Sequence, residues 1–190
     1  MDNFKASIET EIKVMITKEE CEVFFSKSHR IYSQINHYYK LNEDLCLRLR
    51  KAEGEYFIQY KKNNPNEQLK ALKDKTEYSM TISEADFIII QNDPNTLFKY
   101  LDKKRSLTDN AVYRGSLETV RGHVTLDASM PDTEIDINKY NNNIDYELEW
   151  EIRKSQYKKA IRILKKNGID INNRVTGVSK YKRLTQTDLC

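Results

Sequence analysis

The sequence is poor in cysteine and contains no long apolar run. Its three cysteines, Cys21, Cys46 and Cys190, are odd in number and follow neither a disulfide framework nor a metal-ligand spacing. This usage excludes a disulfide-stapled scaffold and fits a reducing cytoplasm. No apolar stretch approaches the length of a membrane span, and residues 1–11 lack the basic-then-apolar pattern of a secretory signal. We therefore expect a cytoplasmic protein without a membrane partner.

An excess of charge of one sign is also missing. Lys and Arg number 32 against 29 Asp and Glu, which gives a net charge of +3, although 32% of all residues are charged. A general nucleic-acid binder would be more basic, so no nucleic-acid partner is expected. The many acids and bases must instead be explained by where each one lies.

Internal repeats, low-complexity tracts and linkers are absent, and a length of 190 residues suits one domain over residues 1–190. Short aromatic and β-branched runs predict many antiparallel strands. Capping residues Thr17 and Ser83 each precede a helical pattern, and a further basic helix is expected to end at Gly168. The polar residues 63–76 are expected to form a loop. Together these features indicate an α+β protein.

The strand candidates share a pattern with one apolar and one charged face. In "SIETEIKVMI", residues 7–16, Ile8, Ile12, Val14 and Ile16 fall on one face of an extended strand and two acids and a lysine on the other. "YELEWEI" and "LCLRLR" alternate in the same way. The charged-face residues of these strand candidates include Glu9, Glu11, Lys13, Arg48, Arg50, Lys61, Glu77, Arg121, Glu147 and Glu149.

Two interpretations of the charged faces are open. The first is the solvated side of an antiparallel sheet. The second is a barrel around an aqueous channel, because the acids gather on the first and last strand candidates and the arginines on the middle ones. Two carboxylates about 7 Å apart repel by roughly 0.6 kcal/mol in water but about 2.4 kcal/mol at an effective dielectric near 20. A closed barrel would therefore need a metal ion on its acidic wall and a polyanion on its basic wall.

The motifs, taken in order, resemble a known family. The pattern Glu9-x-Glu11-x-Lys13 is followed by "LCLRLR", "YFIQYKK", "SLETVR", "TLDAS", "DYELEWEI" and "VSKYKRL". Over about residues 7–184 this order resembles the CYTH domain, or triphosphate tunnel metalloenzyme, superfamily, and most of all its small bacterial single-domain members. The resemblance implies a closed eight-stranded antiparallel β-barrel, a tunnel with a charged interior and helices packed outside. It also implies chemistry on triphosphates with Mg²⁺ or Mn²⁺ as the cofactor.

The resemblance further implies a role for each matching residue. The implied metal-binding and catalytic acids are Glu9, Glu11, Glu147 and Glu149. The implied phosphate-binding residues are Lys13, which is also counted as catalytic, Arg48, Arg50, Lys61, Arg121 and Lys180. Glu77 and Asp127 match acidic positions of less defined role. These residue types suit the chemistry, because hard divalent cations prefer carboxylate oxygens and phosphoryl transfer depends on positioning and charge neutralisation.

The leading hypothesis is a metal-dependent triphosphatase that hydrolyses inorganic tripolyphosphate or a small organic triphosphate, such as thiamine triphosphate or a nucleoside triphosphate. An adenylate cyclase of the class IV type would use the same walls but direct a ribose hydroxyl at the α-phosphate. A non-catalytic polyphosphate- or nucleotide-binding module is a third hypothesis. Either a monomer or a homodimer is compatible with the sequence.

Overall fold

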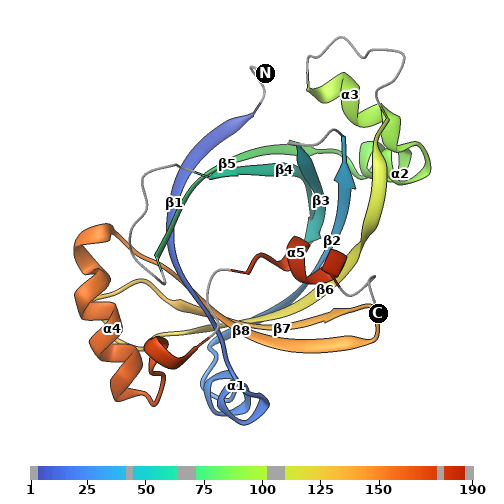
Figure 1. Cartoon of the computed structure of the whole chain (residues 1–190). Helices are drawn as coiled ribbons and strands as arrows, with labels where there is room; N and C mark the ends of the chain where they lie inside the picture. The colour runs from blue at the N-terminus through green and yellow to red at the C-terminus, as the bar shows by residue number, and fades with distance from the viewer. Residues whose placement is uncertain (1–3, 42–44, 64–71, 102–109, 175–177, 187–190) are drawn as a thin grey trace.

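The eight strands of the protein close into one barrel in a computed structural model that describes residues 4–41, 45–63, 72–101, 110–174 and 178–186 (Figure 1). The strands are β1 (Lys5–Met15), β2 (Arg30–Lys40), β3 (Cys46–Ala52), β4 (Glu55–Asn63), β5 (Leu72–Ile82), β6 (Val112–Val124), β7 (Thr133–Tyr140) and β8 (Asn143–Glu151). Around the barrel they follow the order β1-β5-β4-β3-β2-β6-β7-β8, and each neighbouring pair is antiparallel. The expected closed eight-stranded antiparallel barrel is confirmed.

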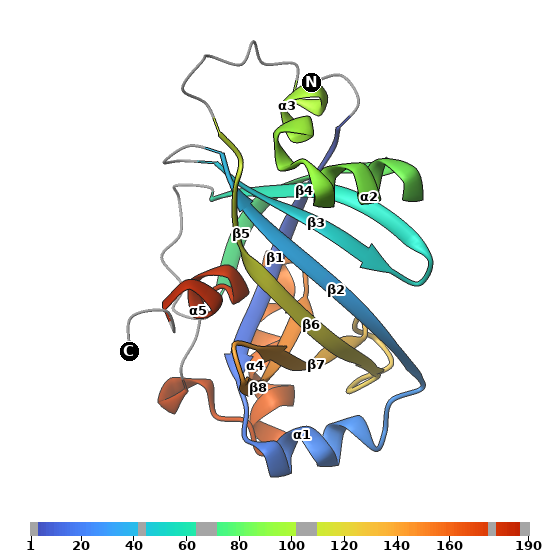
Figure 2. The same cartoon turned by 90° about the vertical axis from the view of Figure 1, so that its right-hand side faces the viewer.

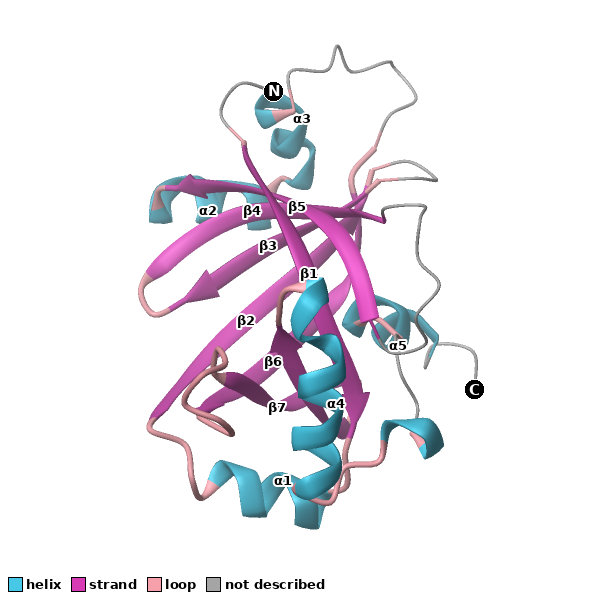
Figure 3. Ribbon diagram, turned by 90° about the vertical axis from the view of Figure 1, so that its left-hand side faces the viewer, coloured by secondary structure: helices cyan, strands magenta, loops and turns pink. Residues whose placement is uncertain are grey.

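Helices lie outside the ring of strands and at one of its ends. They are α1 (Lys18–Phe25), α2 (Glu84–Asn92), α3 (Leu97–Tyr100), α4 (Tyr157–Lys166) and α5 (Lys180–Gln186), and short 3-10 turns cover Pro94–Thr96, Lys154–Gln156 and Ile171–Asn173. Figure 3 shows α1 and α4 together on one part of the outer surface, and α2 with α3 on another. Helix α5 lies within the outline of the ring in Figure 1 but to one side of the strands in Figure 2, so it sits at one mouth of the barrel.

The apolar positions of the strands face outward, towards these helices. Leu47, Leu49 and Ile58 are fully buried in a cluster with Phe87 of α2 and Leu97 of α3. Burying such a side chain contributes roughly 1.5–3 kcal/mol each. The hydrophobic core of the protein therefore lies between the outer face of the barrel and the helices, and polar residues line the inside of the barrel.

A second apolar cluster joins β1 and β8 to α1 and α4. Ile12 and Trp150 are fully buried there, together with Phe24 of α1 and Leu164 of α4. The indole Nε1 of Trp150 donates a hydrogen bond of 2.8 Å to the carbonyl of Pro131, which satisfies its only polar atom. This packing fixes the seam at which the first and last strands of the barrel meet.

The expected helix starts are confirmed, whereas the expected loop over residues 63–76 is wrong at both ends, since Asn63 is the last residue of β4. The Glu20 N–H donates to Thr17 Oγ1 at 3.2 Å, and Ser83 receives the Asp86 N–H at 3.1 Å. Residues 72–76 belong to β5 and pair with β1. Their sequence reads as polar because Lys75 lines the cavity on the inner face of the strand, while Asp74 on the outer face forms an ion pair with Lys154. Residues 64–71 lie outside the described residues.

No helix among the described residues is both long enough and apolar enough to cross a membrane.

Candidate functional site

The barrel encloses a cavity of about 330 Å³ whose wall is dominated by charged side chains. Those charged side chains are Glu9, Glu11, Lys13, Arg48, Arg50, Lys61, Lys75, Glu77, Arg121, Glu134, Glu149, Glu151 and Lys180. All residues singled out in the sequence line it except Glu147 and Asp127. Glu147 is fully buried behind the cavity wall. Asp127 lies in the connection between β6 and β7, where its carboxylate accepts a hydrogen bond from the Ser129 N–H at 2.9 Å.

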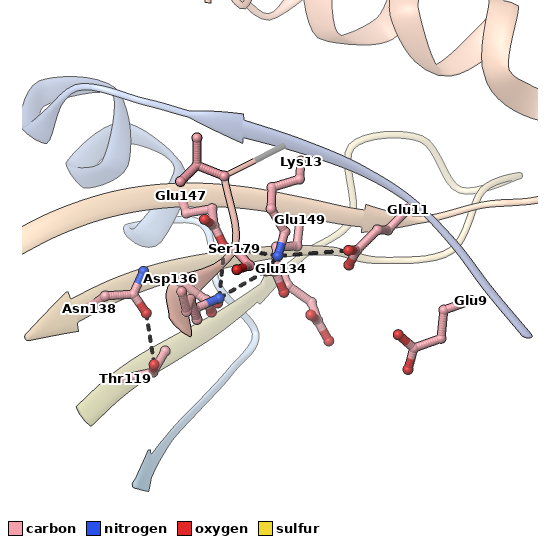
Figure 4. A network of polar contacts seen from close by, with 12 residues as sticks. Glu9, Glu11, Lys13, Thr119, Glu134, Asp136, Asn138, Glu147, Glu149 and Ser179 are labelled. Atoms are coloured by element: carbon pink, nitrogen blue, oxygen red, sulfur yellow. Dashed lines mark hydrogen bonds and ion pairs between the residues drawn. The ribbon is translucent and has the colours of Figure 1, made fainter. Parts of the chain in front are cut away.

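Three buried carboxylates gather on the wall formed by β7 and β8. Asp136, Glu147 and Glu149 each offer an oxygen, and these atoms lie within 4.8 Å of one another. Asp136 pairs with Glu147 across the two strands, and Glu149 follows on the same face of β8. Figure 4 shows the three side chains converging with Lys13, whereas Glu9 lies apart from them. We call Asp136, Glu147 and Glu149 the carboxylate cluster.

The protein's own cations lie against this cluster. The ammonium of Lys180 is 2.7 Å from Asp136, 2.7 Å from Glu147 and 2.9 Å from Glu149. Lys13 pairs closely with Glu149 and lies 3.5 Å from Glu147. The Arg183 guanidinium reaches the second oxygen of Glu147 at 2.5 Å. Both oxygens of the fully buried Glu147 are therefore engaged by residues of α5.

Burial and these ion pairs shift the pKa values of the neighbouring acids Glu147 and Glu149 in opposite directions. Burial opposes ionisation of Glu149, but the ammonium groups of Lys13 and Lys180 hold the pKa of this carboxyl well below its usual value. For Glu147 burial dominates and raises its pKa above the usual value, in spite of the same two lysines. Burial also opposes the charge of Lys180, but the three carboxylates raise its pKa, so its ammonium stays protonated.

Arg121 lies on this acidic wall as well. Its Nε and Nη2 donate to the two oxygens of Asp136 at 2.7 Å each, and Nη2 also reaches Glu149 at 2.8 Å. Its Nη1 forms an ion pair with Glu134 of β7. A guanidinium with every nitrogen bound to a carboxylate has little capacity left for an anionic ligand. The structure thus brings Arg121 together with the acids, although the sequence motif placed it among the phosphate contacts.

The first strand contributes acids that pair with lysines rather than with the carboxylate cluster. Glu11 lies 3.0 Å from the ammonium of Lys75 and 3.7 Å from that of Lys13, and Glu9 pairs with Lys61. Burial works against the charge of Glu11, but Lys13 and the neighbouring lysines lower its pKa to about 2. Both acids therefore line the cavity, and each has a lysine partner.

The opposite wall, built by β3, β4 and β5, is basic. Arg48 donates from Nη2 to Gln59 at 2.7 Å and to Glu77 at 3.0 Å. Lys61 lies 3.2 Å from the same Glu77 carboxylate. Burial opposes ionisation of Glu77, but the charges of Arg48 and Lys61 lower its pKa below the usual value. One carboxylate thus serves two cations on this wall.

Arg50 differs from the other cations of the cavity. The one hydrogen bond that the described residues give its guanidinium runs from Nε to Asn36 Oδ1, at 2.8 Å, and no carboxylate in that part of the chain forms an ion pair with it. Burial lowers its pKa to about 10, and the like charges of Arg48 and Arg121 add to the effect. Arg50 is half-buried, and a cation that is partly removed from water without a counter-ion is costly, so an anion in the cavity would relieve that cost.

Sequence reasoning missed several charged members of this site. Asp136 and Glu134 stand two residues apart in "TEIDINKY", so the alternation already used for other strands would have found them. Lys75 was hidden in the stretch expected to be a loop. Arg183 has no strand pattern, because it lies on α5, and no local signal places it against Glu147.

The carboxylate cluster fits a hard divalent cation by its donor chemistry. Three carboxylates supply only oxygen ligands, which is the preference of Mg²⁺ and Mn²⁺, and no cysteine or histidine belongs to the group. The residues that would hold the ion are Asp136, Glu147 and Glu149. Glu9 and Glu11 face the same cavity but are not part of the group of oxygens within 4.8 Å.

The fold has close structural relatives of low sequence identity. A candidate adenylate cyclase of Bacillus halodurans is 22% identical, with 94% of this chain and 97% of that chain covered and a TM-score of 0.70. HpAC1 of Hippeastrum, a candidate adenylyl cyclase with a dominant triphosphatase activity, is 18% identical, with coverage of 95% and 96% and a TM-score of 0.71. Protein PH1012 of Pyrococcus horikoshii is 18% identical, with coverage of 93% and 98% and a TM-score of 0.60.

A comparison with curated proteins found none that matches. The family model described as the CYTH domain matches residues 7–181, which is most of the sequence. The match covers all eight strands of the barrel except the first two residues of β1, Lys5 and Ala6. This chain therefore belongs to the CYTH domain family.

Proposed function

We propose that the protein is a divalent-metal-dependent triphosphatase that hydrolyses inorganic tripolyphosphate or a small organic triphosphate inside the barrel. The observation that carries this proposal is the contrast between the two walls of one cavity. The carboxylate cluster offers three oxygens to a cation, and across the cavity Arg50 is a half-buried guanidinium that has no carboxylate partner among the described residues. A ligand that carries both a divalent cation and several negative charges, such as a metal-bound triphosphate, matches both walls.

The chain's own residues have distinct tasks in this proposal. Arg50 and Arg48 bind phosphate oxygens, since a guanidinium presents planar paired donors to such groups. Lys61 adds a compact charge at the same wall. Asp136, Glu147 and Glu149 would hold Mg²⁺ or Mn²⁺, which when bound supplies charge neutralisation on the phosphoryl oxygens and a water of lowered pKa.

HpAC1, which shares the fold, supports hydrolysis over cyclisation, because a triphosphatase activity dominates in that protein. At 18% identity this likeness extends to the fold, and the choice of substrate must come from measurement. The cavity of about 330 Å³ has room for a short phosphate chain with or without a small organic group.

The test is phosphate release from tripolyphosphate, thiamine triphosphate and ATP, each with Mg²⁺, with Mn²⁺ and with excess EDTA. Wild type should release phosphate from at least one substrate only when metal is present. Glu149→Gln should abolish release, and Glu118→Gln, the same change on the exposed outer face of β6, should leave it intact. Conversion of ATP to cyclic AMP without phosphate release would favour the cyclase. Substrate binding without any turnover would favour the binding module.

A further inference from the structure

The place where a divalent cation would bind is taken by a side chain of the protein itself. The Lys180 ammonium lies 2.7–2.9 Å from one oxygen of each member of the carboxylate cluster. Those distances are hydrogen-bond lengths, so the nitrogen sits between the three carboxylates. A metal bonded to the same oxygens at about 2.1–2.2 Å would overlap with it.

Access points to the same conclusion. Asp136 and Glu147 are fully buried and do not line the cavity, whereas Lys180, which contacts both of them, does line it. An ion that enters through the cavity therefore meets Lys180 before it meets two of its three ligands. The side chain of Lys180 must move aside before those oxygens can coordinate a metal.

The charges around the cluster make simple addition of a metal unfavourable. Lys13, Arg121 and Arg183 contact the cluster in addition to Lys180, and these three cations also pair with acids outside it, namely Glu11, Glu134 and Asp145. Two more positive charges between the three carboxylates would lie beside the ammonium of Lys180 and be repelled by it, unless this ammonium leaves or an anion arrives.

Lys180 is the cation best placed to leave. Lys13 and Arg121 belong to strands whose backbones are fixed by pairing on both sides, while Lys180 is the first residue of the short helix α5. That helix is anchored further along by Leu184, which is fully buried and packs against Leu117. The lysine side chain can therefore swing without detachment of the helix.

We propose that Lys180 and a divalent cation compete for the carboxylate cluster, and that Lys180 moves to a phosphate oxygen when metal and triphosphate bind together. The second half of this statement rests on the proposed function; the first half does not. The competition makes the metal bind weakly to the free protein and couples its binding to that of the substrate, since a triphosphate provides a new partner for the displaced ammonium. By linkage the coupling is reciprocal.

The test measures Mn²⁺ binding without any phosphate compound, by titration calorimetry at pH 8. Lys180→Met should bind Mn²⁺ at least about tenfold more tightly than wild type. Lys182→Met is the matched control, because it removes an exposed lysine from the same helix and should leave the affinity unchanged. Equal affinities of wild type and Lys180→Met would overturn the proposal. Failure of all three proteins to bind Mn²⁺ would also overturn it, because the cluster would then not be a metal site.

Loss of Lys180 leaves buried carboxylates with fewer partners, so Lys180→Met could fold poorly. Lys180→Gln, which keeps a hydrogen-bond donor, is the second variant. Mn²⁺ should raise the unfolding temperature of Lys180→Gln by more than that of wild type, and an equal or smaller rise contradicts the competition. The nitrogen resonance of the Lys180 ammonium provides a direct readout in wild type: saturating Mg²⁺ should shift it, and an unchanged signal would contradict displacement. Absence of phosphate release in the substrate assay would reject the proposed function without affecting these results.

Discussion

The acidic and the basic wall of the cavity solve the problem of buried charge in different ways. On the acidic wall each carboxylate of the cluster is bound by at least two cations of the chain, with Lys180 shared among all three. On the basic wall Glu77 is shared by Arg48 and Lys61, Lys61 also reaches Glu9 of β1, and Arg50 has a neutral amide as its hydrogen-bond partner. The acidic wall is thus internally compensated, while the basic wall keeps positive charge available. An anion that binds in the cavity would therefore stabilise the basic wall more than the acidic wall.

Removing one ligand of the acidic wall should have the largest effect. Asp136→Asn takes one negative charge from the cluster and weakens its hold on a divalent cation, so metal-dependent phosphate release should fall by about 10²–10³-fold. Initial rates at saturating substrate across a Mg²⁺ series would measure this. Asp132→Asn, the same change at a half-exposed position outside the cavity in the connection before β7, is the control, and a similar fall in both variants would contradict the assignment.

On the basic wall, Arg50→Met should separate binding from stability. The affinity for metal-free tripolyphosphate should fall by about tenfold to a hundredfold, because a charged hydrogen-bond donor is lost. The unfolding temperature should rise, since burial and like charges disfavour this guanidinium in the free protein. Calorimetric titration and thermal unfolding measure the two effects. Arg162→Met, at an exposed position on α4, should change neither, and a lower unfolding temperature of Arg50→Met would show that the free protein needs this charge.

The acid that compensates the basic wall should make stability depend on pH. The pKa of Glu77 is lowered in the folded protein from its usual 4.5, so the carboxylate contributes stability above pH 4.5 and loses it as the pH falls further. Glu77→Gln should therefore be less stable than wild type by about 1 kcal/mol at pH 7, and the difference should become smaller as the pH falls from 4.5 to 3. Urea unfolding at the two pH values is the measurement. A difference that is the same at both values would point to packing instead of charge.

The smallest effect is expected from Lys61, whose side chain is 30% exposed at the cavity wall. Exposed ion pairs contribute little, so Lys61→Met should weaken tripolyphosphate binding by only about threefold. Lys62→Met is a matched control, because Lys62 lies over the rings of Tyr60 and Tyr78 and does not line the cavity. Equal losses in the two variants would mean that overall charge, not position, determines the affinity.

The fold could be predicted from the sequence to a large extent because the alternation of each strand is local. Leu47 and Leu49 alternate with Arg48 and Arg50, and the structure buries the leucines beneath helices and turns the arginines into the cavity. The alternation alone left open whether the charged face met solvent or a channel. That choice depends on closure of the sheet between β1 and β8, which no single strand encodes.

The partners of the charged residues could not be predicted in the same way. The motif placed Lys180 and Arg121 with phosphate-binding residues, and the structure of the free protein places both among carboxylates. Which acid a lysine or arginine meets depends on the register of β7 with β8 and on where α5 docks. The short turn at Asn141 and Asn142 sets the first, but the docking of α5 depends on contacts between distant parts of the chain, and residue types alone do not contain it.

The seam between β1 and β8 has a consequence for how the protein is made. Lys13 pairs with Glu149 across this seam, so two residues of one site are separated by most of the polypeptide. Closing so long a loop is entropically costly, and folds dominated by such distant pairings form slowly. During synthesis β1 therefore cannot pair with β8 until this last strand has left the ribosome. Until then the inner face of β1, which carries two acids and a lysine, stays in contact with water. The outer face of the same strand, with Ile12 and Val14, is exposed for equally long, so the nascent chain carries an apolar surface that invites chaperones or aggregation.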